Sequence, residues 1–286
     1  AGGNTTRCVL TEVGTTEHSP INNITYITVA TTGNGTDFGD TTVARDDVAA
    51  VNNSTRLVFG GGDTGDEVQS NVMDYVTIAS TGNGTDFGDL TSARFNHGSA
   101  SNSTTGLFAG GTTGGASSNR KNIIDSITVA STGNATDFGD LTLSMEGVSG
   151  ASDSNLASQN ESYFAPAAMG LYAGGRSASN IAETFTHYVN IATDGEAGSF
   201  GDLTAGRWTF AGGAASSTRS VFAAGKLQSG TNTDIMDFFA FSTKGKATDF
   251  GDTSAALQNV TTTSNATRGI LGGGYTGSAG VNTIEY

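Results

Sequence analysis

The amino-acid sequence predicts an all-β fold, a single β-propeller built from four-stranded blades. A phenylalanine in a Phe-Gly-Asp unit recurs at separations of 49, 51, 62 and 50 residues, as Phe38, Phe87, Phe138, Phe200 and Phe250. Each period also holds several short apolar runs, and glycine is frequent (42) whereas proline is rare (2). A period near 50 with several short strands per copy is typical of propellers rather than of helical arrays.

Four strands are expected in each repeat, and the copy over residues 92–142 displays them best. They are expected at Ser92–Asn102, Gly106–Gly111, Asn122–Ser131 and Thr136–Thr142. The Gly133-Asn134 pair between the third and fourth strands favours the positive φ of a tight hairpin. The repeat TGNxTDFGDLT therefore predicts a hairpin that joins these two strands in every copy.

Two arginine positions follow the same period. One lies shortly before the end of the second strand, as Arg56, Arg219 and Arg268. The other lies seven residues after the marker phenylalanine, as Arg45, Arg94 and Arg207. We expect the arginines to hold one blade to the next through carbonyls or carboxylates, because guanidinium groups form strong bonds to both. The marker phenylalanines are expected in the core.

These features resemble the kelch repeat, in which an arginine, an apolar strand ending in Gly-Gly, another apolar strand and an aromatic residue follow one another. Arg94, Gly110-Gly111 and Phe138 fill those positions. Phenylalanine replaces the usual kelch tryptophan. The third-strand tyrosine occurs only as Tyr26, Tyr75 and Tyr286. The narrower TGNxTDFGDLT wording is similar to kelch-like repeats in fibre and adhesin proteins of tailed bacterial viruses, which implies a virion component.

The repeats indicate one domain over residues 1–286 and, most simply, six blades. Five Phe-Gly-Asp units accompany six second strands, so incomplete blades are expected at both termini. Five and seven blades stay open as alternatives, as does a fragment of a longer chain.

One repeat is longer than the others. The interval between Phe138 and Phe200 holds about a dozen extra residues, within 152–168, between the expected first and second strands. Loops that break the symmetry of a ring often carry binding. We therefore take Tyr163 and Phe164, together with Trp208, as candidate ligand-binding residues. The alternatives are a tolerated excursion of the loop and a buried Trp208.

The charge balance disfavours two classes of partner. The formal net charge is −14, from 27 acidic and 13 basic residues. Such an acidic surface repels the phosphates of nucleic acids and anionic lipids. No apolar run approaches the roughly 20 residues of a membrane-spanning helix. Cys8 is the only cysteine, so neither a disulfide framework nor a thiolate metal site is expected.

Catalytic and metal signals are weak. The three histidines fall in different parts of the repeat, and the Phe-Gly-Asp units lack the other motifs of a kinase. No metal centre is predicted. Calcium stays open, because Asn34, Thr36, Asp37 and Asp40 gather oxygen atoms without the alternating acidic ladder of a dedicated loop.

Three Asn-x-Ser/Thr triplets share one hairpin position, at Asn34, Asn83 and Asn134. In a secreted eukaryotic protein these turns could carry glycans. In a bacterial virus they would be bare, and a chain this rich in Asn, Ser and Thr also produces such triplets by chance.

The expected function is a non-enzymatic structural and attachment protein of a virus fibre or spike. It would associate with other virion proteins, form a homo-oligomer and bind host-surface glycans by many weak contacts. One alternative is an extracellular glycoprotein or filament subunit. The other is a propeller enzyme acting on polysaccharide, because propellers assemble carboxylate pairs from separate blades.

Overall fold

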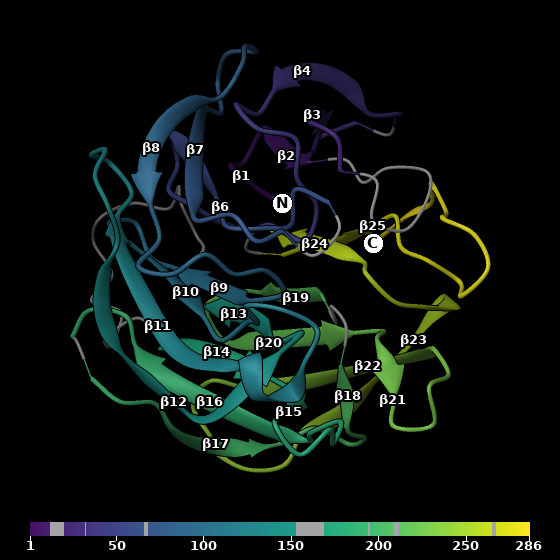
Figure 1. The fold of residues 1–286 in the computed structure, drawn as a ribbon. Coiled ribbons are helices and arrows are strands. Elements are labelled where there is room, and N and C mark those ends of the chain that lie inside the picture. The colour runs from purple at the N-terminus through teal and green to yellow at the C-terminus, as the bar shows by residue number, and fades with distance from the viewer. Residues whose placement is uncertain are drawn as a thin grey trace.

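The computed structural model describes residues 1–11, 20–31, 33–65, 68–152, 169–193, 195–208, 212–264 and 267–286. These residues form a six-bladed β-propeller of small antiparallel sheets (Figure 1). The all-β propeller predicted from the sequence is thus confirmed. Within the described ranges there is no α-helix, and hence none that could cross a bilayer.

Each blade starts with an inner strand and runs outward, with neighbouring strands antiparallel. Blade 1 has β1 (Gly2–Gly3), β2 (Arg7–Thr11), β3 (Asn23–Thr28) and β4 (Thr36–Asp40). Blade 2 has β5 (Ala49–Asn52), β6 (Arg56–Gly60), β7 (Val72–Thr77) and β8 (Thr85–Asp89). Blade 3 has β9 (Gly98–Ser101), β10 (Thr105–Ala109), β11 (Lys121–Thr128) and β12 (Thr136–Glu146), with β15 (Arg176–Ser177) added at its edge.

The second half of the ring continues in the same order. Blade 4 has β13 (Ser149–Ser152), β14 (Met169–Ala173), β16 (Phe185–Asn190) and β17 (Gly198–Asp202). Blade 5 has β19 (Gly212–Ala215), β20 (Arg219–Ala223), β22 (Thr233–Ala240) and β23 (Thr248–Leu257). Blade 6 has β24 (Thr261–Ser264), β25 (Gly269–Gly272) and β26 (Ile284–Glu285). A separate pair joins β18 (Arg207–Trp208) to β21 (Lys226–Leu227).

The ring closes between the first and last blades. The inner strands contact their neighbours in sequence, and β24 of blade 6 contacts β1 of blade 1. Among the described residues, blade 6 has three strands, and the place that a fourth strand takes in the other blades is not filled.

The marker phenylalanine is the extra residue of a β-bulge. In blade 3, Ile124 pairs with Gly139 and Asp125 pairs with Asp137, so that Phe138 is passed over. The same register shift occurs in blades 1, 2, 4 and 5. A bulge locally twists a strand and redirects a side chain. The rings of Phe38, Phe87, Phe138 and Phe200 enter clusters that are each drawn from two neighbouring blades. Phe250, expected in the core, is instead 52% exposed, because no outer strand of blade 6 lies beside it among the described residues.

The inner strands begin later than the sequence suggested. In the best repeat the first strand is β9, which starts at Gly98 rather than at Ser92. The preceding segment turns at Asn96, whose φ is 59°, a left-handed conformation incompatible with a continuous strand. This turn carries Arg94 into the protein interior, where it is fully buried.

For orientation, two ends of the propeller are defined here. The turn end holds the connections between first and second strands and between third and fourth strands. The loop end holds the connections between second and third strands and between each outer strand and the next inner strand.

Candidate functional site

The recurring turn and the Phe-Gly-Asp unit join each blade to the next. The N–H groups of Gly82 and Gly84 in blade 2 donate to the carbonyls of Phe38 (2.7 Å) and Asp40 (2.6 Å) in blade 1. The matching pair of bonds joins blade 3 to blade 2, blade 4 to blade 3 and blade 5 to blade 4. We call each such pair of backbone hydrogen bonds between neighbouring blades the main-chain clasp. Most residues of the repeat therefore have a structural role in joining the blades.

This close approach explains the glycine in the unit. A Cβ on Gly88 would lie 2.4 Å from the carbonyl oxygen of Gly133 in the next blade, and Gly88 has φ +138°. Its counterparts Gly39, Gly139 and Gly201 face the following turn in the same way. Only glycine leaves room for another backbone at such a position.

Three of the predicted arginines form buried ion pairs within their own blade. Arg94 donates to Asp125 over 2.8 Å, and both side chains have no exposed surface. Arg207 pairs with Asp237 over 2.7 Å, and Arg45 pairs with Asp74. Buried charges of this kind are retained when they are paired and hydrogen-bonded. Arg94 also donates to the carbonyl of Phe108, and Asp125 accepts from both the N–H and the hydroxyl of Thr91.

Blade 4 replaces both members of this pair. Met145 stands where the other blades have arginine, and His187 stands where they have aspartate. His187 is buried, and its Nδ1 lies 3.1 Å from the hydroxyl of Thr142. Burial lowers the pKa of His187 to about 4, so the ring is neutral near neutral pH. In blade 6 the corresponding residues are Leu257 and Glu285, and Glu285 accepts from the hydroxyl of Ser254.

The second set of arginines lies against the aromatic residues of the third strands. The guanidinium of Arg56 lies 4.1 Å from the ring centre of Tyr75. Arg219 and Arg268 lie in the same way over Phe238 and Tyr286. Arg56 also donates to the carbonyl of Val129 in blade 3. At Arg56 a cation–π contact is thus combined with a bond between blades.

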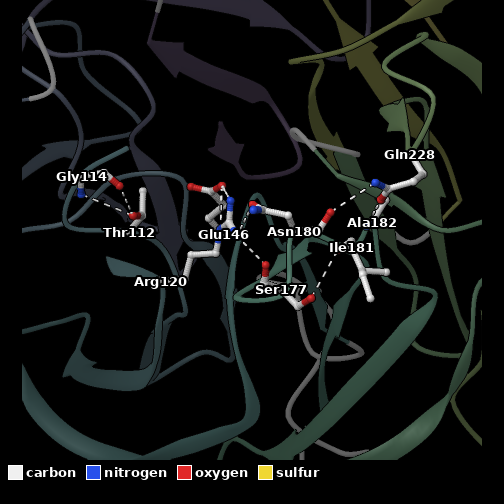
Figure 2. A network of polar contacts seen from close by, with 9 residues as sticks. All are labelled: Thr112, Gly114, Arg120, Glu146, Ser177, Asn180, Ile181, Ala182 and Gln228. Carbon is white, nitrogen blue, oxygen red and sulfur yellow. Dashed lines mark hydrogen bonds and ion pairs between the residues drawn. The ribbon is translucent and has the colours of Figure 1, made fainter. Parts of the chain in front are cut away.

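A polar network links the loops of blades 3, 4 and 5 at the loop end (Figure 2). Arg120 donates to Glu146 (2.8 Å) and to the amide oxygen of Asn180 (2.9 Å). Gln228 of the next blade donates to the carbonyl of Asn180 and accepts from the N–H of Ala182. Because each loop is bonded to its neighbour, the network holds their relative positions.

Trp208 lies beside this network. It is half-buried, with the guanidinium of Arg176 at 4.4 Å and the ammonium of Lys226 at 5.6 Å from its ring centre. We call Trp208, Arg176, Lys226, Asn180 and Gln228 the loop patch. It combines an aromatic ring, two cations and two exposed amides.

Of the ligand residues predicted from the sequence, only Trp208 lies among the described residues. Tyr163 and Phe164 lie outside the described residues. The strands that flank them, β13 and β14, meet through the pair Ser152 and Gly170, which lies at the turn end. Trp208 lies at the loop end. The sequence did not single out Arg176 or Lys226, since they reach Trp208 through the pairings of β15 with β12 and of β21 with β18.

The asparagines at the hairpin turns are exposed and also bond to the neighbouring blade. The side-chain oxygen of Asn83 accepts from the N–H of Asp40, and that of Asn134 accepts from the N–H of Asp89. Asn34 lies at the equivalent turn of blade 1 and is exposed.

The central channel holds a cavity of about 150 Å³ that is lined mostly by small residues of the inner strands. Its hydroxyl groups bond neighbouring strands together. Ser99 donates to the carbonyl of Ala50 and Ser152 donates to that of Ser101. His97 borders the channel, and burial together with Arg94 lowers its pKa well below the usual value. Among the described residues, no three His, Cys, Asp or Glu side chains are grouped as metal ligands.

Comparison with known proteins adds no relative. A scan against protein-family models found no match, and a search of curated proteins found no similar sequence.

Proposed function

We propose that the chain is a non-enzymatic, kelch-like attachment propeller of a virus fibre or spike, and that its loop patch contacts glycans on the host surface. The observation that carries the proposal is the composition of the loop patch. Arg45, Arg94 and Arg207 are committed to buried pairs with aspartates inside the protein. Here cations, amides and an aromatic ring meet at the end of the ring.

The chemistry of the patch suits sugars. Indole rings stack on the apolar faces of sugar rings, and amides such as those of Asn180 and Gln228 can donate and accept hydrogen bonds at once. Lys226 and Arg176 favour glycans that carry a carboxylate. The bonds from Arg120 and Gln228 hold the loops in place before binding, which reduces the entropy lost on association.

The virion assignment rests on the TGNxTDFGDLT repeat and its resemblance to viral fibre repeats. Weak sites can together give firm attachment when several copies act on one surface. The protein is therefore expected in a homo-oligomer with other virion proteins, outside the cell.

Two single substitutions, one of a charge and one of an amide, test the patch. Lys226→Glu and Gln228→Ala should weaken binding to a glycan array and to host cells. Lys246→Glu is the matched control, because it makes the same charge change at an exposed position of the blade 5 turn. Equal binding by all three variants and the parent would refute the loop patch.

The virion assignment is tested separately, by density-gradient fractionation of the native source. The protein should sediment with nuclease-protected DNA and capsid protein. Sedimentation apart from both would refute it.

A further inference from the structure

The marker phenylalanine of blade 5 is exposed, whereas its equivalents in blades 1 to 4 are buried. Phe38, Phe87, Phe138 and Phe200 are 2–5% exposed, each against the following blade, whereas Phe250 is 52% exposed. The ring of Phe250 touches Phe238 of its own blade. An exposed phenylalanine at a position that is buried in four equivalent blades points to an uncovered interface.

The polar groups at this position are uncovered as well. At four interfaces, turn N–H groups donate to the carbonyls of the marker phenylalanine and of the aspartate two residues later. Within the described part of the chain, no turn bonds in this way to the carbonyls of Phe250 and Asp252. Gly251 reflects the same difference. A Cβ there would meet no backbone atom within 4 Å, whereas in the other four blades it would meet the next turn at 1.7–2.6 Å.

Blade 1 presents the other half of the same interface. Its turn residue Gly35 is exposed, whereas the equivalent Ala135, Ala197 and Ala247 are 7–9% exposed. Among the described residues, neither Gly33 nor Gly35 donates its N–H to another blade. Donors on one side and acceptors on the other thus face the outer position of blade 6.

The strand that leads into this position is already docked. In β26, Glu285 accepts from the N–H and the hydroxyl of Ser254, as Asp125 accepts from Thr91 in blade 3. On either side of Glu285, Ile284 and Tyr286 are 43% and 80% exposed. The established blade interface therefore continues up to Tyr286, which is equivalent to Tyr75 in blade 2.

We propose that the gap between blade 5 and blade 1 binds a β-hairpin of the chain's own repeat type, with a Gly-Asn turn followed by a Thr-Asp-Phe-Gly-Asp strand. The turn N–H groups of the hairpin donate to the carbonyls of Phe250 and Asp252, and its apolar side chains cover Phe250. The carbonyl of its own phenylalanine accepts from Gly33. Recognition of this kind is strand addition, in which main-chain bonds supply affinity and pockets supply specificity.

The hairpin must come from a segment that is not already part of a blade. In the described part of the chain, the five hairpins of this repeat type each lie in their own sheet, so a second copy would have to open a blade to supply one. The gap lies at blade 6 and the loop patch at blades 4 and 5, so that the two sites can be tested separately.

A synthetic peptide with the sequence of Val76–Thr91 is the direct probe, because it supplies the residues that follow Tyr75 in blade 2. Titration calorimetry should show saturable binding to the protein. Phe250→Ser should weaken binding by about tenfold or more, because an apolar contact of that size is lost. Leu143→Ser is the matched control, since Leu143 is 40% exposed in another blade, and it should bind as the parent does.

A second measurement covers a peptide that orders too poorly to bind. The same residues fused after Tyr286 act at high effective concentration and should raise the thermal unfolding temperature of the parent but not of Phe250→Ser. Absence of both peptide binding and stabilisation by fusion overturns the proposal. Equal peptide binding by Phe250→Ser and the parent also overturns it. So does a parent protein that is dimeric without peptide and becomes monomeric on Phe250→Ser, because the occupant would then be a second copy.

Discussion

Replacing Arg94 tests whether losing one member of a buried ion pair destabilises the protein more than losing both members. The Arg94→Met change leaves the carboxylate of Asp125 fully buried, with the N–H and hydroxyl of Thr91 as its partners. The chain itself supplies the matched replacement, since blade 4 uses Met145 and His187 at the same two positions. The double variant Arg94→Met/Asp125→His therefore gives blade 3 the arrangement of blade 4.

The expected magnitudes follow from the burial of the pair. Removing one member of a buried ion pair typically costs about 3–5 kcal/mol, because the remaining charge is unpaired. Arg94→Met should lose stability on that scale, including the bond from Arg94 to the carbonyl of Phe108. The double variant removes both charges, so it should be more stable than Arg94→Met by about 2 kcal/mol.

Urea unfolding followed by circular dichroism and by the fluorescence of Trp208 gives the required free energies, provided that the two transitions coincide. The single Asp125→His variant completes the double-mutant cycle. A loss below about 1 kcal/mol for Arg94→Met would refute the reasoning, as would a double variant less stable than Arg94→Met.

Three further predictions concern single positions. Gly88→Ala should destabilise the protein by about 1–3 kcal/mol more than Gly251→Ala in the same urea assay. Both glycines have positive φ, but only Gly88 faces the backbone of a neighbouring blade. Equal losses of stability would contradict the clasp. Because the pKa of His187 is about 4 in the folded protein and about 6.5 when unfolded, falling pH protonates the unfolded state first. Between pH 7 and pH 5 the parent should thus lose about 2 kcal/mol more stability than His187→Gln, and parallel pH profiles would be inconsistent with this. Burial raises the pKa of the Cys8 thiol to about 11, so a thiol reagent at pH 8 should label it only after unfolding, and rapid labelling of the native protein would argue against its burial.

The fold could be predicted from the sequence because its signals are repeated. Five copies of the Phe-Gly-Asp unit fix the period, and the glycine of this unit marks the place where the next turn approaches in four blades. The start of an inner strand could not be predicted in this way. It depends on the left-handed turn at Asn96, which carries Arg94 inward.

The partners of the arginines are visible in the sequence only once the structure indicates where to look. Asp125 lies 31 positions after Arg94 in the chain, and nothing local connects them. A signal does exist, since the two repeats with Met145 or Leu257 in place of arginine also lack the aspartate. The loop patch carries no such signal. Arg176 and Lys226 reach Trp208 through pairings of short loop strands that no period predicts.

The main-chain clasp between blades gives the ring a direction. Every bond of this type runs from the turn of a later blade to the outer strand of the blade before it. During synthesis, each blade would therefore acquire its last contacts only when the next one emerged. Because the donors and acceptors of the clasp are backbone groups, these particular bonds do not depend on which side chains a repeat carries. Blade number in such a ring can thus change by whole repeats, while the surface loops vary independently.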